Sequence, residues 1–185
     1  MIPTARQNLP KGTAEVIAGR IESIRFRKDL FHLIVRILLI GAIAYFLFTR
    51  VLLITRVSGQ DMFPSLKDGD LVIAFRMQKD YQKGDIVVCR TENGQIIERI
   101  AANSHDVVNM DDSGTLTVNG TNQTGEIIYP TYAKESLIYP YRVPEDSVFL
   151  LGDYRTVAVD SRDFGPVSKV QFLGKVITIL RRREL

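Results

Sequence analysis

Asp85-Ile-Val-Val-Cys-Arg-Thr-Glu-Asn-Gly-Gln-Ile-Ile-Glu-Arg-Ile-Ala101 is the stretch that decides the fold. It contains two short runs rich in β-branched residues, 85–90 and 95–101, with the turn residues Asn93 and Gly94 between them. Such runs, bounded by Gly, Asn and Asp, are typical of short β-strands. Similar runs recur outward in both directions, at 71–75, 106–110, 115–118, 147–151 and 175–180. We therefore predict an all-β, mainly antiparallel domain, built as a barrel or a sandwich.

An apolar segment precedes the β-rich region. From Leu30 to Ile54 the chain is dominated by apolar residues, and its uncharged centre lies between Arg36 and Arg50. A membrane helix needs about 20 residues, and arginines near its ends can extend to the interface. The flanking basic cluster favours such a helix over a buried helix of a soluble domain. The lack of a small-residue cleavage site after the run argues against a cleaved signal peptide.

The net charge of +3 is confined to the N-terminus. The first 30 of the 185 residues hold six basic and three acidic side chains, and the rest of the chain holds equal numbers of each. This asymmetry predicts a cytoplasmic N-terminus and an extracellular C-terminal domain in a single-pass protein of the cell membrane. We predict a cytoplasmic basic segment over 1–30, a transmembrane helix over 31–54 and an extracytoplasmic β domain over 55–185. A folded domain with balanced charge is not typical of nucleic-acid binding, so no nucleic-acid partner is expected.

Cysteine and histidine are scarce. Cys89 is the sole cysteine, and His32 and His105 are the only histidines. An intramolecular disulfide is therefore excluded, and a His/Cys metal site is not expected. We expect no metal and no cofactor. Cys89 lies within a β-rich run and is predicted to fill space in the core.

Three motifs carry a resemblance to a known family. They are Val57-Ser-Gly-Gln-Asp-Met-Phe-Pro-Ser-Leu-Lys-Asp-Gly-Asp70; Glu98-Arg-Ile-Ala-Ala-Asn-Ser-His-Asp106; and Gly152-Asp-Tyr-Arg155 running into Asp160-Ser-Arg-Asp-Phe-Gly-Pro-Val167. In content and order they resemble the type I signal peptidase family, over about residues 30 to 180. The resemblance implies a signal-peptidase-like β domain with a cleft that binds an extended peptide as an added strand.

The two catalytic positions of that family are changed in this chain. The resemblance places Asp61 where the family has its nucleophilic serine, and Glu98 where it has its general-base lysine. A carboxylate has no hydroxyl to offer, and Glu98 has the wrong charge for a neutral amine base. Tyr154 and Ala158 also depart from the family's pattern. The resemblance therefore implies that the catalytic dyad is degenerate.

Positions with an architectural role in the family are kept. Asp160 and Arg162 match a carboxylate–guanidinium pair that organises the family's site. Gly59 stands where some members have an oxyanion-binding hydroxyl. The other matching positions, expected to line or brace the cleft, are Met62, Pro64, Arg99, Gly152, Asp153, Ser161 and Gly165.

The residues leave other chemistries open. A relocated pair of Ser65 and Lys67 would need a desolvated lysine, whereas Lys67 lies in a polar turn. Asp61 and Glu98 would share a proton, as in aspartic proteases, if they lie within hydrogen-bond reach. A scaffold that binds a sortase or an active signal peptidase through another face is a third hypothesis.

The resemblance extends to the catalytically degenerate signal-peptidase-like proteins of streptococci, which act in pilus assembly. It implies a non-catalytic chaperone or assembly factor whose partners are pilin subunits or their signal-peptide region, a sortase and the lipid bilayer. The alternative is an active type I signal peptidase with unorthodox catalytic residues. The segment 121–146, rich in Tyr and Pro, is predicted to form an extended excursion over the surface.

Overall fold

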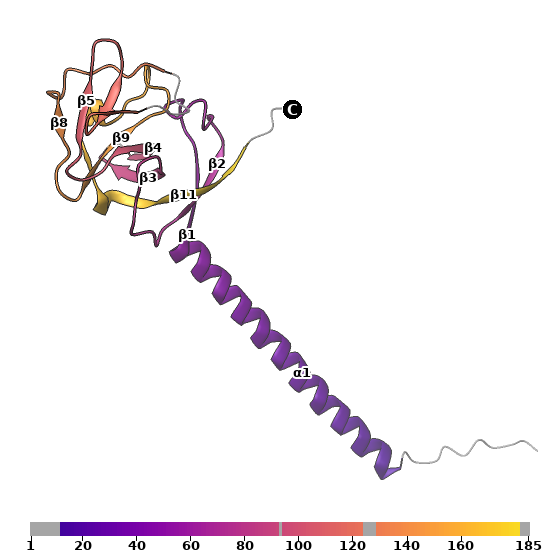
Figure 1. The fold of residues 1–185 in the computed structure, drawn as a ribbon. Coiled ribbons are helices and arrows are strands. Elements are labelled where there is room, and N and C mark those ends of the chain that lie inside the picture. Colours follow the sequence, from indigo (N-terminus) through magenta and orange to yellow (C-terminus); the bar gives the residue numbers. More distant parts are fainter. Residues whose placement is uncertain (1–11, 93, 124–128, 182–185) are drawn as a thin grey trace, which may run out of the picture. The chain divides into compact units, whose positions relative to one another are not determined.

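The computed structural model describes residues 12–92, 94–123 and 129–181. The chain divides into two compact units, residues 1–46 and 47–185. The first unit contains one long helix, α1 (Thr13–Phe46), shown in indigo and purple in Figure 1. A π-helical turn, η1 (Leu47–Val51), follows it in the chain.

The segment Arg25–Val51 is long and apolar enough to cross a membrane, and none of it is buried within the protein. An apolar helix without a protein core against it is typical of one that faces lipid. The helical structure ends three residues before the end predicted from the apolar run. Leu52, Leu53 and Ile54 pair with Phe75, Ala74 and Ile73 as part of a strand. Apolarity continues across this boundary, so the run alone does not reveal where pairing with another strand replaces the helix.

The second unit is an antiparallel β domain, as predicted. One sheet has seven strands in the order β1-β2-β11-β3-β4-β9-β10, and the other has four in the order β7-β6-β5-β8. The first sheet comprises β1 (Leu52–Arg56), β2 (Leu71–Phe75), β3 (Ile86–Thr91), β4 (Gly94–Ala102), β9 (Ser147–Leu151), β10 (Val167–Ser168) and β11 (Phe172–Leu180). The second comprises β5 (Val107–Met110), β6 (Leu116–Val118), β7 (Thr121–Asn122) and β8 (Tyr141–Arg142). A short helix, α2 (Ser161–Phe164), and a 3-10 turn, η2 (Lys169–Gln171), complete the domain.

The seven-stranded sheet curls so that its first strand returns to β4. The Gln95 amide Nε2 on β4 donates a hydrogen bond to Thr55 Oγ1 on β1 at 2.6 Å. Three strands separate β1 from β4 in the sheet order, which would hold them about 19 Å apart if the sheet were flat. The curl encloses a core cluster of Val57, Met62, Leu66 and Val72. The domain therefore has the character of a partly closed barrel at this end.

Two further core clusters stabilise the other end of the domain. One packs β4 and β9 against β5 and β6, with Phe149 and Leu151 fully buried. In Figure 1, β5 and β8 lie on the far side of the domain from β1 and β2. The other cluster contains Cys89, which is fully buried, confirming its predicted place in the core. Burial raises the pKa of the Cys89 thiol, so the thiolate is disfavoured.

The excursion 121–146 is largely irregular, apart from the short strands β7 and β8. Its residues 124–128 lie outside the described part of the chain. Thr131 is buried, and its amide donates to the Gly114 carbonyl at 2.8 Å. The described part of the excursion is therefore attached to the domain at defined points.

Candidate functional site

Asp61 lies in the loop between β1 and β2. The loop turns tightly, with the Phe63 amide donating to the Gln60 carbonyl at 2.9 Å and the Leu66 amide donating to the Met62 carbonyl at 2.9 Å. Met62 and Leu66 are buried and anchor the loop to the barrel core. The Asp61 side chain turns back toward Gly59, since a Cβ built on Gly59 would lie 3.6 Å from Asp61 Oδ2. Gly59 itself has a φ of 89°, a conformation that favours glycine.

Glu98 lies on β4, opposite Val87 of β3. Its side chain is only 1% exposed, and Oε2 is buried without a hydrogen-bond partner within the described structure. Burial is the main reason that the pKa of Glu98 is raised well above its ordinary value, and the charges of Asp160, Asp61 and Asp153 raise it further. Glu98 is therefore biased toward the neutral carboxylic acid.

A small cavity of about 90 Å³ lies between β1, the following loop and the first half of β4. Its lining residues are Arg56, Val57, Ser58, Asp61, Met62, Gln95, Ile96, Ile97 and Glu98. The structure thus brings Asp61 and Glu98, the two positions that the resemblance singled out, to one cavity. Both carboxyl groups border this cavity, and the sharing of one proton between them stays a prediction.

Gly152, directly after β9, is packed against both Asp61 and Glu98. A Cβ on this residue would lie 2.4 Å from Ala158 Cβ, 2.6 Å from the Asp61 carbonyl oxygen and 3.2 Å from Glu98 Oε2. The Tyr154 amide donates to the same Asp61 carbonyl at 2.8 Å. The 152–154 segment therefore holds the Asp61 loop in place, and only glycine allows the backbone to approach so closely.

Arg99 and Asp153 form a two-pronged ion pair. Arg99 Nε donates to Asp153 Oδ1 at 2.8 Å, and Nη2 donates to Oδ2 at 2.6 Å. Nη1 donates to the Gly84 carbonyl at 2.8 Å, and Nη2 also donates to Ser65 Oγ at 3.3 Å. Lys67 is exposed. The alternative Ser65–Lys67 pair is therefore not formed, because the serine contacts a permanently charged guanidinium instead of a desolvated lysine.

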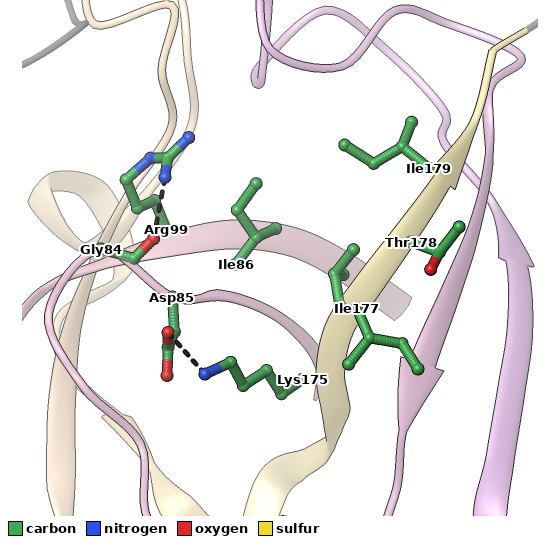
Figure 2. A pocket seen from close by; sticks show the side chains of 9 residues that line it. Gly84, Asp85, Ile86, Arg99, Lys175, Ile177, Thr178 and Ile179 are labelled. Atoms are coloured by element: carbon green, nitrogen blue, oxygen red, sulfur yellow. Dashed lines mark hydrogen bonds and ion pairs between the residues drawn. The ribbon is translucent and has the colours of Figure 1, made fainter.

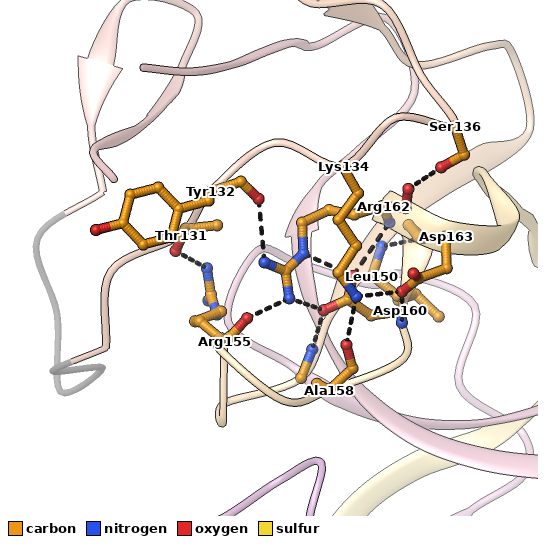
Figure 3. Close-up of polar contacts among 12 residues, drawn as sticks. Thr131, Tyr132, Lys134, Ser136, Leu150, Arg155, Ala158, Asp160, Arg162 and Asp163 are labelled. Carbon is orange, nitrogen blue, oxygen red and sulfur yellow. Dashed lines mark hydrogen bonds and ion pairs between the residues drawn. The ribbon is translucent and has the colours of Figure 1, made fainter. Parts of the chain in front are cut away.

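Asp160 and Arg162 form the predicted carboxylate–guanidinium pair, shown in Figure 3. Arg162 Nε donates to Asp160 Oδ1 at 2.9 Å and Nη2 to Oδ2 at 2.8 Å, and both side chains are almost fully buried. Asp160 also caps the N-terminus of α2 and accepts the Gly152 amide at 3.2 Å. Arg162 Nη2 donates in addition to the Arg155 carbonyl at 2.6 Å. The pair braces the turn that supports Gly152.

The other predicted positions fall into two groups. Met62 borders the cavity, while Ser161 is buried and its Oγ accepts the Leu150 amide at 2.9 Å. Gly165 ends α2 with a φ of 84°. Pro64 is exposed in the β1–β2 loop. The cavity lining does not include Ser161, Gly165 or Pro64. These residues therefore shape the backbone around the site and do not border the cavity.

Arg155 is a buried residue of the site that the motif analysis did not single out. It is 6% exposed, Nη1 donates to Thr131 Oγ1 at 3.1 Å, and Nε has no hydrogen-bond partner within the described structure. Burial lowers the pKa of Arg155 to about 10. Lys134 is a second such residue, since its Nζ contacts the Ala158 carbonyl at 2.8 Å (Figure 3). Position 155 stands inside a quoted motif, whereas nothing in the sequence marks Thr131 or Lys134.

A second pocket, shown in Figure 2, is larger, but its charged side chains are paired with one another or with other residues. It has a volume of about 270 Å³ and lies between the segments 84–86 and 175–179, next to Arg99. Its Asp85 and Lys175 form an ion pair at 2.8 Å. Its charged groups therefore have partners within the protein. No group of three or more His, Cys, Asp or Glu side chains suited to a metal ion occurs in the described residues.

Comparison with known proteins relates the chain to peptidases. The sequence model of the family described as "Signal peptidase, peptidase S26" matches residues 30–180. The chain is 33% identical to "Probable thylakoidal processing peptidase 2, chloroplastic" of Arabidopsis thaliana, over 63% of this chain and 34% of that protein. It is 28% identical to "Signal peptidase IB" of Staphylococcus aureus, over 81% of this chain and 88% of that protein. The match thus spans about a third of the length of the plant relative.

A solved structure, the crystal structure of a signal peptidase I from Enterococcus faecalis V583, is 26% identical in sequence. The match covers 54% of this chain and 98% of that one, with a TM-score of 0.45.

Proposed function

The chain belongs to the signal peptidase family, peptidase S26, and is a membrane protein, and from this premise we propose that it binds an extended segment of a secreted precursor without cleaving it. The single observation that carries this proposal is the pair of carboxyl groups at the cavity. Asp61 and Glu98 border it together, and Glu98 is buried with a raised pKa. Peptide hydrolysis by a serine peptidase needs a hydroxyl nucleophile and a base that activates this hydroxyl.

Other hydroxyls near the site do not replace the missing serine. Ser65 contacts the Arg99 guanidinium, and Ser161 is buried against the Leu150 amide. Ser58 borders the cavity and is exposed, but no lysine or histidine lines that cavity. A serine without an adjacent neutral base stays a weak nucleophile near neutral pH.

The surroundings of Gly59 also oppose acyl chemistry. The family resemblance assigns this position to the stabilisation of an oxyanion. Asp61 Oδ2 faces it, 3.6 Å from where a Cβ would lie. A carboxylate in that place would repel the negative charge that develops on the substrate carbonyl during hydrolysis.

The strands around the cavity support binding of a peptide as an added strand. Within the described part of the chain, β1 pairs with β2 alone, and β4 pairs with β9 only from Arg99 onward. Backbone groups of residues 95–98 that point away from β3 therefore face the side of β1. We call the space between residues 95–98 and 56–58, which contains the cavity, the groove. An extended peptide could pair with these open edges, because a strand added to an unpaired edge gains main-chain hydrogen bonds.

The orientation and partners belong to the same proposal. The basic N-terminal segment supports a cytoplasmic N-terminus, with the β domain outside the cell membrane. The resemblance to degenerate signal-peptidase-like proteins supports a role as a chaperone or assembly factor, with a pilin subunit or its signal-peptide region as cargo and a sortase as partner. β1 begins at Leu52, directly after the turn that ends at Val51. In the sequence, the strand that borders the groove therefore follows the membrane segment without a linker.

A second candidate function is an acid peptidase that uses the two carboxyl groups. One observation favours it: a neutral Glu98 and the Asp61 carboxyl border the same cavity. A general acid and base of this kind must hold one water between them.

A cleavage and retention assay tests the proposal. The full chain in detergent micelles is incubated with a pilin precursor that carries its signal peptide, next to Asp61→Ala and to the restored pair Asp61→Ser with Glu98→Lys. We expect the wild type to retain the precursor on a pull-down without cutting it. Cutting by the wild type that Asp61→Ala abolishes would contradict the proposal and support the acid peptidase.

A matched pair of exposed substitutions separates cleft binding from a scaffold role. Ser58→Trp fills the rim of the cavity, and Val170→Trp changes η2, where Val170 is 90% exposed. We expect Ser58→Trp to abolish retention of the precursor and Val170→Trp to leave it unchanged. Retention that survives Ser58→Trp would show that another face of the protein carries the interaction.

A further inference from the structure

The charged groups around the cavity are unequally partnered. Asp153 has both oxygens on Arg99, and Asp160 has both oxygens on Arg162. The remaining buried guanidinium of this network, Arg155, donates to Thr131. Of the four carboxyl groups of Asp61, Glu98, Asp153 and Asp160, two are thus paired with a guanidinium group, and those of Asp61 and Glu98 have no such ion pair among the described residues.

The two carboxyl groups without a cationic partner are those that border the cavity. The described residues provide no hydrogen bond or ion pair to the side chain of Asp61 or of Glu98, and Glu98 Oε2 is buried. A buried polar atom without a partner is costly, so its presence beside a cavity points to a partner that comes from outside the chain.

The rest of the lining suits a side chain with a long apolar stem. Val57, Met62 and Ile97 provide apolar walls. Arg56 is the one cation in the lining, and its Nε donates to the Gly69 carbonyl at 3.4 Å. The Gln95 amide is bound to Thr55. Neither side chain contacts the two carboxyl groups.

We propose that the cavity receives a lysine side chain of the bound peptide, whose ammonium pairs with the carboxyl groups of Asp61 and Glu98. The inference rests on the proposed function, because the lysine belongs to the peptide held in the groove. A lysine fits better than an arginine, since its compact ammonium lies at the end of a flexible apolar stem. The bound cation supplies the ion-pair partner that these two carboxyl groups lack among the described residues.

Binding of this cation is linked to the ionisation of Glu98. An empty cavity favours the neutral acid, because burial and the neighbouring carboxylates raise the pKa of Glu98. An ammonium in contact favours the ionised form. The affinity for a lysine-containing peptide should therefore rise as the pH rises through the raised pKa, whereas the affinity for an uncharged analogue should stay level.

The test measures peptide binding to the full chain in detergent micelles by fluorescence anisotropy. The probe is a labelled seven-residue peptide of alternating threonine and valine with a central lysine. The comparison peptides carry norleucine or Nε-acetyl-lysine at that position, which keep the stem and remove the charge. We expect the lysine peptide to bind roughly tenfold or more tightly than either, as for a charge-assisted contact in a partly buried site.

Two variants and a control locate the effect. Glu98→Gln combined with Asp61→Asn should abolish the lysine preference, so that the lysine and norleucine peptides bind this variant with equal affinity. Glu145→Gln, an exposed acid outside the cavity lining, should change neither affinity. A lysine preference that survives the double substitution would overturn the inference.

The outcomes separate this inference from the proposed function. If all three peptides bind the wild type equally, peptide binding stands and the lysine inference fails. If no peptide binds, and the pilin precursor is not retained either, the proposed function fails and the inference fails with it. Because the comparison peptides are tested on the unchanged chain, misfolding of a variant cannot imitate either result.

Discussion

Asp160 and Arg162 lie two residues apart, yet both are almost completely removed from water. Their two-pronged contact satisfies the carboxylate, and the remaining guanidinium protons reach backbone carbonyl groups of Arg155 and Tyr132. A buried pair of this kind does not by itself prove a gain in stability, but loss of one partner leaves an isolated buried charge.

Arg162→Met should therefore destabilise the β domain by about 3–5 kcal/mol, because the Asp160 carboxylate loses its partner. The matched control is Lys83→Met, which removes the partner of Asp106 from a pair whose lysine is 40% exposed. That control should cost about 1 kcal/mol or less. Urea unfolding of the full chain in micelles, followed by the near-UV circular dichroism of its tyrosines, measures both. Equal losses would contradict the burial argument.

Glu98 makes stability depend on pH. Its pKa in the folded protein is raised above the ordinary value of 4.5, so the folded state holds the proton more tightly than the unfolded state. The stability from this group is present below about pH 4.5 and is lost as the pH rises through the folded pKa. Glu98→Gln should remove this pH dependence and raise the unfolding free energy at pH 8 by about 1–3 kcal/mol. Thermal unfolding between pH 5 and pH 8 tests this, and parallel pH profiles of wild type and variant would disprove it.

At the scale of elements, two backbone segments meet at the site. The end of β9 approaches the β1–β2 loop so closely that the Asp61 carbonyl lies 2.6 Å from where a Cβ of residue 152 would be. The motif containing Gly152 is thus explained by contact between segments about 90 residues apart in the sequence, and the loop cannot shift without losing the Tyr154 hydrogen bond.

Gly152→Ala should displace the Asp61 loop and destabilise the domain by about 1–3 kcal/mol, as expected of overpacking. The retention of the precursor should fall with it. Gly41→Ala is the control, because a Cβ at position 41 would have no described atom within 4 Å apart from its chain neighbours and its own helix backbone. The control should leave the unfolding of the β domain unchanged. Unaltered retention by Gly152→Ala would mean that the position of the loop does not matter for binding.

The strands β1 and β4 are joined across the groove by one side-chain hydrogen bond between Gln95 and Thr55. A double-mutant cycle with Thr55→Val and Gln95→Leu should give a coupling energy of about 0.5–1.5 kcal/mol, the usual net value of such a bond. The measurement is again urea unfolding in micelles. A coupling energy near zero would indicate that other contacts hold the curl of the sheet.

At the scale of the whole molecule, the two units have separate sources of stability. The three core clusters of the described residues lie within 47–185, and the apolar window of Arg25–Val51 has no residue buried in the described structure. A helix of this kind depends on lipid or detergent, whereas the β domain buries its own apolar surface.

A chain of residues 47–185 should therefore fold without detergent and unfold within a few degrees of the β domain in the full chain. The full chain should partition into the membrane fraction, and the shortened chain should lose this partitioning. Circular dichroism and membrane fractionation test the two halves. A shortened chain that is unfolded in water would show that the helical segment contributes to the fold of the domain.

Much of the fold could be predicted from local patterns. Each of the β-rich runs, from 71–75 to 175–180, forms a strand, because alternation and turn residues act over a few positions. The motifs also marked Asp61, Glu98, Asp160 and Arg162 as residues of one site. The strand β1 was missed, because its apolar residues continue the run of the membrane segment without a break.

What the sequence by itself determined is therefore the β architecture, the apolar segment near the N-terminus and the presence of carboxyl side chains at positions 61 and 98. Only the tertiary structure decided which charges meet: Arg99 with Asp153 across 54 residues, and Glu98 beside a cavity without a partner. It also decided that β1 curls back to β4 and opens a groove between them. The physical reason is range: strands and turns follow from neighbouring residues, whereas pairs of buried charges depend on the register and curl of strands that are distant in the chain.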